Sequence, residues 1–345
     1  MTGPRSVLGM TLYNNATHFR EATDSILAQT RRDFALLMLD DGSSDEVEAM
    51  ARQYERQDQR VRYVRHPQRQ GMVPTWKEVA EMARRAHPDA EYFAWVSDHD
   101  RWDARWLERM TAELDTRPNA VLAYPQTVRI DDAGAIVDKE PRAFDTSGVT
   151  SAADRWRHFC WNGFGSGDMV YGLMRMRALE AAGIFRPVLN PDRMLIAELT
   201  LLGEIHQVPE PLWSRRQSGG ASVARQSTSL FAGDTPPRFN WPPSLQHAVL
   251  LRQQGVAPSR VAIYVVASAW RATRKTDTSK SIGRGVDNVH FVKKLVKKGA
   301  RHAVYYTLVG ARMAAAKIRR AARKVVYEVL MLTHRAGLRG RTNTR

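Results

Sequence analysis

The stretch YFAWVSDHDRWDARWL, Tyr92–Leu107, decides which fold the chain is expected to adopt. It begins with the aromatic and apolar run Tyr92–Val96, whose length and composition are typical of a buried strand. The run ends in the polar tetrapeptide SDHD. In an extended chain, side chains two residues apart point to the same side. Asp98 and Asp100 would then present two carboxylates together, and His99 would face the other way.

The paired carboxylates of Asp98 and Asp100 indicate a metal site. Like charges held close together need a cation or a shared proton, and carboxylate oxygens suit hard cations such as Mg²⁺ or Mn²⁺. Such a cation would hold a diphosphate and neutralise charge on a departing phosphate. The alternative is that these residues form a turn and cap a helix over Asp103–Leu114. The tripeptide alone favours that simpler interpretation, because short motifs often match by chance.

Strand and helix patterns alternate along the first part of the chain. The predicted strands are Ser6–Leu12, Phe34–Leu39, Val61–Val64, Tyr92–Val96, Ala120–Val128 and Ala135–Val137, and the predicted helices are Thr17–Gln29, Asp45–Arg56 and Thr75–Ala86. This alternation predicts an α/β fold with a mostly parallel, doubly wound sheet and helices on both faces.

In sheets of this kind, ligands bind beyond the carboxyl ends of the strands. Three polar clusters fall at such ends: Thr11–Asn14, Asp40–Asp41 and Asp98–Asp100. Neither G-x-G-x-x-G nor G-x-x-x-x-G-K-[ST] follows the first strand, which disfavours a dinucleotide or P-loop phosphate site. A metal would then be needed to bind phosphate.

The pattern loosens after Pro141. The segment Trp156–Gly167, rich in Trp, Gly and Phe, is predicted as a loop that either approaches a ligand or is simply packed. The other expected elements are a strand over Met169–Leu173, helices over Met176–Ala182 and Pro191–Leu202, a strand over Val208–Arg216, and a proline-containing linker over Ser227–Pro243.

Charge is spread unevenly over the 345 residues, whose net charge is +16. Residues 252–345 carry 22 Lys and Arg against 3 Asp and Glu, a net charge of +19, while residues 1–251 carry a net charge of −3. The two parts are therefore expected to have different partners. We expect a catalytic domain over 1–226, a linker over 227–243 and a basic helical region over 244–345.

Cys160 is the only cysteine. Disulfides within one chain and cysteine-rich zinc sites are therefore excluded. We expect Cys160 to be a small buried residue rather than a nucleophile. The sequence shows neither a secretory signal nor an apolar run long enough to span a bilayer. A cytoplasmic protein is the expectation.

Between Ser6 and Ser222 the chain resembles the family 2 glycosyltransferases, which have the GT-A fold. Four passages carry the resemblance, in order: TLYNN (Thr11–Asn15), SILAQTRRDFALLMLDDGSSD (Ser25–Asp45), SDHD (Ser97–Asp100) and PDRMLIAELTLLG (Pro191–Gly203). They stand where the family has its T-x-Y-N sequence, its second-strand passage, its D-x-D metal motif and a later passage with an acidic residue eleven positions before a glycine.

The resemblance implies a role for each matching residue. Thr11, Tyr13, Asn14 and Asp41 would hold the base and ribose of a nucleotide-sugar. Asp98 would meet the ribose or the metal, and Asp100 would ligate the metal. Asp192 would be the general base that deprotonates an acceptor hydroxyl, which implies inversion at the anomeric carbon by direct displacement.

The chain departs from the family pattern around the base. An acidic pair is usual there, whereas Asn190-Pro191 precedes Asp192, and Glu198 is a weaker candidate for the base. Gln217 also stands where many members have a histidine, which leaves a metal or phosphate contact from that position open. Arg215 or Arg216 would pair with the diphosphate instead, or form a solvated surface pair.

The basic region contains an apolar stripe with heptad spacing, from Val304 to Leu332, flanked by Lys and Arg. A basic amphipathic helix suits an anionic membrane surface, and a helix packed on the catalytic domain or in a dimer is the equally weighted alternative. No specific nucleic-acid partner is expected, because no recognised binding module accompanies the charge.

Together these features predict an inverting, metal-dependent transferase that moves a sugar from a nucleotide-sugar to a hydroxyl acceptor on a cell-envelope glycan or glycolipid. It would work in the cytoplasm or on the cytoplasmic face of the membrane. Two alternatives remain: a nucleotidyltransferase, and a non-catalytic protein that binds membranes or polyanions through its basic tail.

Overall fold

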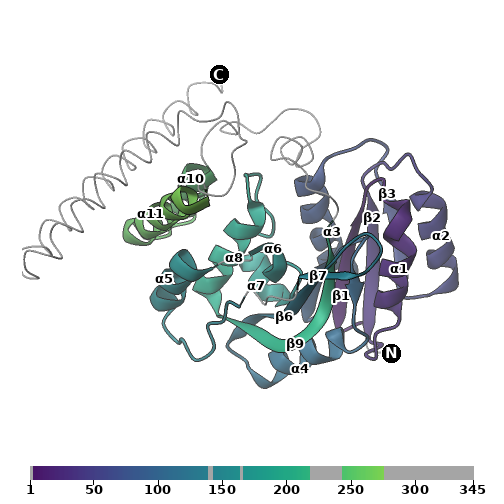
Figure 1. Ribbon diagram of the computed structural model, residues 1–345, viewed down its shortest axis with the longest axis horizontal. Helices are drawn as coiled ribbons and strands as arrows, with labels where there is room; N and C mark the ends of the chain where they lie inside the picture. The colour runs from purple at the N-terminus through teal and green to yellow at the C-terminus, as the bar shows by residue number, and fades with distance from the viewer. Residues whose placement is uncertain (1–2, 139–142, 164–165, 218–242, 276–345) are drawn as a thin grey trace, which may run out of the picture. The chain divides into compact units, whose positions relative to one another are not determined.

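The computed structural model describes residues 3–138, 143–163, 166–217 and 243–275 (Figure 1). The elements run in the order β1 (Ser6–Leu12), α1 (Ala16–Leu27), β2 (Phe34–Asp40), α2 (Val47–Gln57), β3 (Val61–Arg65), α3 (Met72–Ala86), β4 (Tyr92–Val96), β5 (Arg101–Trp102), α4 (Trp106–Thr116), β6 (Ala120–Ile130), β7 (Ile136–Asp138), α5 (Ala152–Asn162), α6 (Ser166–Met169), β8 (Leu173–Arg175), α7 (Met176–Ala181), α8 (Pro191–Leu202), β9 (Glu204–Arg216), α10 (Pro243–Gln253) and α11 (Pro258–Lys275).

The strands form one sheet in the order β3-β2-β1-β4-β8-β6-β9-β5, with β7 paired to β6. The neighbours β3, β2, β1 and β4 run parallel. The short strand β8 is antiparallel to both β4 and β6, and β6 is again parallel to β9. The prediction of a mostly parallel α/β sheet flanked by helices is confirmed.

The alternation of side chains along β1 explains how helices come to cover both faces of the sheet. Leu8, Met10 and Leu12 belong to one buried cluster, together with residues of α1, α2 and α4. Gly9, which points the other way, faces α3: a Cβ there would lie 2.8 Å from the Phe93 ring and 3.1 Å from Val79. Figure 1 shows α1 and α2 on one side of β1–β3 and α3 on the other.

Strand register brings the predicted polar clusters to one edge of the sheet. Leu12 pairs with Asp40, and Met10 pairs with Val96. The residues that follow these strands therefore emerge together.

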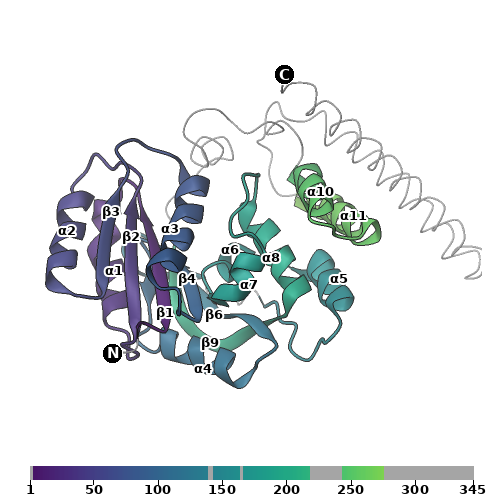
Figure 2. The ribbon, with the colours of Figure 1, turned by 180° about the vertical axis from the view of Figure 1, so that it is seen from behind.

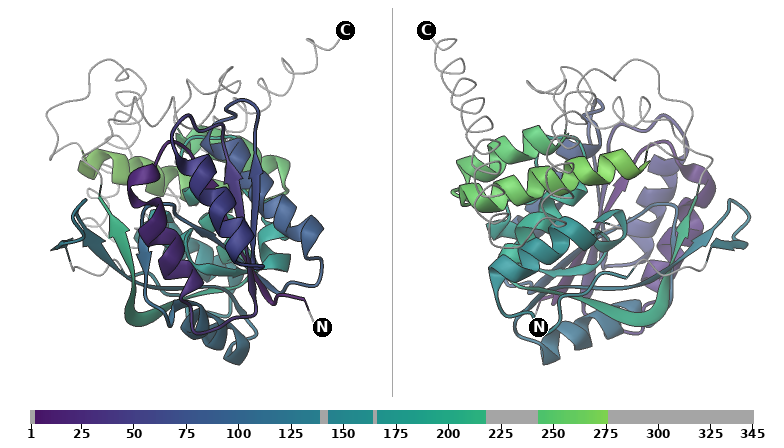
Figure 3. Two further views of the ribbon diagram at one scale, coloured as in Figure 1. Left: turned by 90° about the vertical axis from the view of Figure 1, so that its right-hand side faces the viewer. Right: turned by 60° about the vertical axis from the view of Figure 1, so that its left-hand side comes forward.

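The long curved strand β9 reaches the same edge, because Arg101 of β5 pairs antiparallel with Ser214 (Figure 3). The helices α6, α7 and α8 lie beside β6 (Figure 2).

Two sequence-based predictions are wrong in this region. Most of Trp156–Gly167 is not a loop, because α5 occupies Ala152–Asn162: Trp156, Phe159 and Cys160 recur at helical spacing and are fully buried. A continuous strand over Met169–Leu173 is also wrong, since α6 ends at Met169 and β8 begins at Leu173. Between them, Gly172 packs so closely on β6 that a Cβ would lie 2.5 Å from the Ala123 carbonyl oxygen.

The chain divides into two compact units, Met1–Pro237 and Arg238–Arg345. In the second unit the described part consists of α10 and α11, with His247 Nδ1 2.6 Å from the Tyr264 hydroxyl. The predicted stripe from Val304 to Leu332 lies outside the described residues. Within the ranges given above, no helix combines the length and apolar character needed to cross a bilayer.

Candidate active site

The residues after β1 join the end of β1 to the end of β2. Asn14 has a left-handed backbone with φ of 49°. Its backbone N–H donates to the Ser43 hydroxyl at 3.1 Å, and its side-chain oxygen accepts a hydrogen bond from the Ser44 backbone N–H at 2.7 Å. Tyr13 projects outward and is 42% exposed, while Thr11 is half-buried in β1. Asn14 therefore holds the turn from which Tyr13 is presented.

Asp41 organises the loop that precedes α3. Its carboxylate accepts the backbone N–H groups of Gln70 at 2.6 Å and Gly71 at 2.8 Å, and lies 3.2 Å from His66 Nδ1. The same loop places the Arg69 guanidinium 4.4 Å from the Tyr13 ring centroid, within the range of a cation–π contact. The structure thus brings Asp41 and Tyr13 to one corner of the site and adds Arg69, for which the sequence carries no local signal.

Asp98 and Asp100 are both buried where β4 ends. Contrary to the extended-chain prediction, His99 does not face away from them: its Nδ1 lies 2.7 Å from Asp98 Oδ1, and its Nε2 lies 3.9 Å from Asp100 Oδ1. The prediction failed because the strand stops at Val96, so strand alternation no longer applies. Burial alone would lower the pKa of His99, but the hydrogen bond and charge of Asp98, together with Asp100, outweigh it and raise this pKa.

The two carboxylates fit a hard divalent cation, because carboxylate oxygens are the ligands that such cations prefer. Asp98 Oδ1 accepts hydrogen bonds from Asn15 and His99, and Asp100 Oδ1 accepts the Arg216 N–H at 2.8 Å. Among the described residues no donor reaches Oδ2 of either group. Burial, with Asp98 acting in the same direction, raises the pKa of Asp100, a cost that a cation would offset.

The described residues contain no group of three or more His, Cys, Asp or Glu that could hold a metal ion by itself. Mg²⁺ commonly keeps several waters and is bound through one or two carboxylates together with phosphate oxygens.

Arg216 holds the D-x-D segment in place. Its side chain, 1% exposed, donates to the backbone oxygens of His99 at 2.9 Å, Asp131 at 2.8 Å and Asp132 at 2.7 Å, and pairs with Glu21. The guanidinium is thereby committed to contacts that fix the segment around His99 and the turn at Asp131. Of the two arginines that the sequence offered for a diphosphate, Arg216 is therefore structural.

Arg215 has a different environment. Its Nη1 donates to Asp168 Oδ1 at 2.6 Å and to the Gly167 carbonyl at 2.9 Å. Asp168 is itself buried and bonded by Arg129 at 2.6 and 2.8 Å. Burial lowers the pKa of Arg215, but Tyr171 and Asp168 raise it by more, so the net shift is upward. Because its side chain keeps 35% of its surface exposed, Arg215 offers a fixed cation to the site.

Asp192 lies in the first turn of α8, which begins with Pro191 after the left-handed Asn190. Its Oδ2 accepts the Ser166 hydroxyl at 2.8 Å. A Cβ built on Gly167 would lie 3.7 Å from this oxygen and 3.4 Å from Arg215 Nη1. Asp192 and Arg215 therefore flank the same glycine.

Two other residues singled out in the sequence lie elsewhere. Glu198 is buried along α8 and pairs with Arg186 at 3.1 Å. Gln217 is exposed, and its backbone N–H donates to the Ile130 carbonyl at 2.8 Å. Asp192 is thus the acidic residue of α8 that the structure brings to Arg215.

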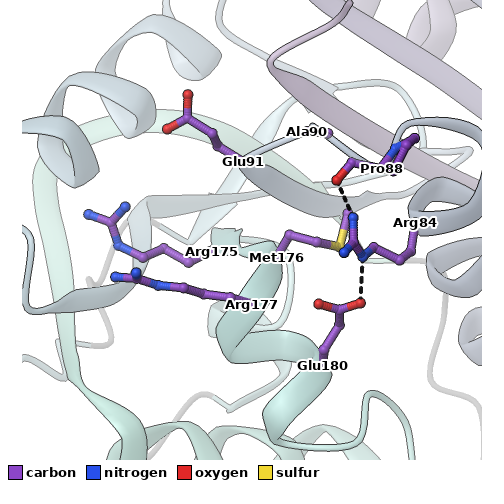
Figure 4. A pocket seen from close by; sticks show the side chains of 8 residues that line it. All are labelled: Arg84, Pro88, Ala90, Glu91, Arg175, Met176, Arg177 and Glu180. Carbon is purple, nitrogen blue, oxygen red and sulfur yellow. Dashed lines mark hydrogen bonds and ion pairs between the residues drawn. The ribbon is translucent and has the colours of Figure 1, made fainter.

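A pocket of about 260 Å³ lies at the opposite edge of the sheet, where β4 begins (Figure 4). Arg84 and Glu180 pair across it at 2.7 Å. Arg175, which lies beside Arg177, donates to the carbonyls of Ala120 and Leu114. These contacts secure the sheet edge, and the pocket is separate from the carboxylates described above.

Comparisons with known proteins point to one family. Residues 8–165 match the model of glycosyl transferase family 2. The protein named as glycosyltransferase EpsH of Bacillus subtilis (strain 168) is 24% identical over 140 residues, which cover 41% of this chain and 39% of that protein. Glycosyltransferase RP339 of Rickettsia prowazekii (strain Madrid E), named as uncharacterized, is 46% identical over 43 residues, 12% of this chain and 14% of that protein. Each match spans well under two thirds of the relative's length.

The fold has a solved counterpart in S. aureus TarS. Its fragment 1–349 in complex with UDP-GlcNAc matches with a TM-score of 0.60 and 15% identity, covering 96% of this chain and 92% of that one. Identity this low establishes the shared fold and leaves the substrate open. The chain therefore has a GT-A fold, and its residues 8–165 are similar to glycosyl transferase family 2.

Proposed function

We propose that this glycosyltransferase moves a sugar from a nucleotide-sugar to a hydroxyl acceptor by direct, inverting displacement, with a divalent cation. One observation carries the proposal: two consecutive residues of β9, Arg215 and Arg216, link the D-x-D carboxylates to Asp192. The Arg216 backbone N–H donates to Asp100, while Arg215 and Asp192 both lie within 4 Å of the position that a Cβ on Gly167 would take. A donor's diphosphate bound near Asp98 and Asp100 and an acceptor hydroxyl bound near Asp192 would therefore both lie close to Arg215.

The chain's own residues divide the work. Asp98 and Asp100 would hold a cation whose chemistry is to bind the diphosphate and offset its charge. Arg215, fixed by Asp168, would pair with a diphosphate oxygen. Asp192 would take the acceptor proton as the acceptor oxygen bonds the anomeric carbon and the bond from that carbon to the diphosphate breaks. The diphosphate would leave with the bonding electrons.

At the nucleoside end, Tyr13 and Arg69 would face the base, and Thr11 and Asn14 belong to the same corner. Asp41 would act chiefly by shaping the loop 66–71, because its carboxylate already accepts three described hydrogen bonds. Its predicted contact with the base stays a prediction.

Incubation with a panel of UDP-, GDP- and dTDP-sugars and Mn²⁺ should release nucleoside diphosphate from one donor class, and EDTA should stop the release. Measurement of nucleoside diphosphate by a coupled assay checks this. Formation of pyrophosphate from a sugar phosphate and a nucleoside triphosphate would support the nucleotidyltransferase alternative instead. Failure of all donors to yield diphosphate would contradict the proposal.

We also propose that the basic region holds the enzyme near an acceptor in a cell-envelope glycan or glycolipid, at the cytoplasmic face of the membrane. Residues 276–345 carry 17 Lys and Arg against 3 Asp and Glu. Each basic side chain near an anionic surface contributes about 1 kcal/mol, and salt screens this attraction over about 10 Å at 0.1 M.

The full chain should therefore sediment with anionic liposomes and be released by salt. A chain ending at Lys275, which keeps α11 and its His247–Tyr264 contact, should stay in the supernatant. Equal sedimentation of both forms, or indifference of the full chain to lipid charge, would return this region to a packing or dimerisation role.

A further inference from the structure

Tyr171 occupies the turn between α6 and β8, directly beside Arg215. Its ring packs on Trp213 at a centroid distance of 4.9 Å and forms a T-shaped pair with Trp76 at 5.4 Å. The Arg215 guanidinium lies 5.9 Å from the Tyr171 ring centroid and 5.7 Å from that of Trp213. Contacts from β9 and α3 thus confine the ring to one orientation beside the cation of the site.

The pKa of the Tyr171 hydroxyl is affected by the charges of the D-x-D carboxylates and by that of Asp192. Burial is the largest cause that raises its pKa; Asp100, Asp98 and Asp192 act in the same direction, and Arg215 opposes them. The hydroxyl therefore stays protonated at neutral pH and can donate a hydrogen bond.

We propose that the Tyr171 hydroxyl donates a hydrogen bond to the donor's β-phosphate, the group that leaves with the nucleoside. This inference rests on the proposed function. A β-phosphate would lie between Asp98 and Asp100, which act with a cation, and Asp192, which faces the acceptor. A neutral donor there stabilises negative charge as it develops without transferring its proton. Packing against Trp213 and Trp76 preorganises the hydroxyl, because the ring needs no reorientation when the phosphate binds.

The test variant is Tyr171→Phe, which removes the hydroxyl and keeps the ring. Calorimetric titrations with UDP, GDP and dTDP in Mn²⁺ identify the diphosphate that binds the wild type. Hydrogen bonds to charged groups are the stronger ones. The variant should therefore bind that diphosphate about 10-fold more weakly, while binding of the matching monophosphate, which lacks the β-phosphate, should be unchanged. Turnover should fall by about 10–100-fold.

Tyr54→Phe is the matched control, since that hydroxyl donates to Asp24 between α2 and α1, away from the site. It should lose some thermal stability and keep both diphosphate affinity and turnover. The melting temperature of Tyr171→Phe should stay near that of the wild type, because the ring contacts remain.

The outcomes separate this inference from the proposed function. A wild type that binds diphosphate but transfers no sugar would overturn the function and still allow the diphosphate-against-monophosphate comparison to decide on Tyr171. Wild-type diphosphate affinity in Tyr171→Phe, or an equal loss for monophosphate, would overturn the role of Tyr171. A loss of turnover with intact diphosphate affinity and a shifted pH profile would also overturn this role, since the hydroxyl would then position Asp192. If the wild type binds none of the three diphosphates, the inference also falls.

Discussion

Replacing Asp100 with asparagine or alanine should lower metal-dependent turnover by about 10²–10³-fold, since a cation acting on a phosphoryl oxygen contributes several kcal/mol of transition-state stabilisation. Both substitutions remove the negative charge that would ligate the cation. In calorimetric titrations, Mn²⁺ should strengthen nucleoside diphosphate binding to the wild type and have little effect on binding to either variant.

The two variants differ in what they leave behind. Asparagine keeps an oxygen that can accept the Arg216 N–H, whereas alanine leaves that buried donor without a partner, at a cost of about 1–3 kcal/mol. Only Asp100→Ala should therefore lose stability, while both lose the coupling between metal and nucleotide. Asp103→Asn, a carboxylate that serves the turn before α4, should retain turnover. Unchanged coupling in Asp100→Asn would remove Asp100 from the metal site.

Asp192→Asn should slow transfer by about 10²–10⁴-fold, the usual contribution of a general base. The amide cannot take the acceptor proton, yet it can still accept the hydrogen bond from the Ser166 hydroxyl, so α8 should begin as before. Donor binding should survive, because Asp192 is not proposed to touch the nucleotide. Single-turnover kinetics with a saturating donor separates the two effects.

Glu198→Gln provides the comparison within the same helix. Glu198 pairs with Arg186 and is buried, so the substitution should lower stability more than transfer. Near-normal transfer by Asp192→Asn, combined with a large loss in Glu198→Gln, would mean that the base has been assigned to the wrong carboxylate.

The parts of the site that the sequence predicts are those that follow directly from strand ends. The apolar runs Phe34–Leu39 and Tyr92–Val96 mark where the buried chain stops, and parallel register then forces Asp41 and Asp98 to the same edge. The bounds of α8 could also be predicted, because Pro191 and Gly203 mark its two ends. Local patterns therefore position these residues without knowledge of tertiary contacts.

The remaining parts depend on contacts between distant segments. Nothing near Asp168 in the sequence indicates that Arg129 and Arg215 would converge on it, because the pairing arises only when β6 and β9 lie side by side. Tyr171 was missed for the same reason, since its neighbours Trp76 and Trp213 come from α3 and β9. A lone aromatic in a turn gives no signal of its own.

The orientation of His99 shows how a correct strand can still lead to a wrong side-chain prediction. Tyr92–Val96 is a strand as expected, but the alternation of side chains ends with its last residue. Beyond that point the backbone turns, and His99 comes within 2.7 Å of Asp98. The ends of regular elements, where functional groups gather, are the places where periodicity stops being informative.

The central claim is a direct displacement in which Asp192 activates the acceptor and the diphosphate leaves from beside Asp98 and Asp100. Its most direct test is the anomeric configuration of the transferred sugar, measured by nuclear magnetic resonance on product formed from the active donor. Direct displacement predicts a configuration opposite to that of the donor. A product that retains the donor's configuration would contradict it, because retention requires a second displacement or a different attacking group.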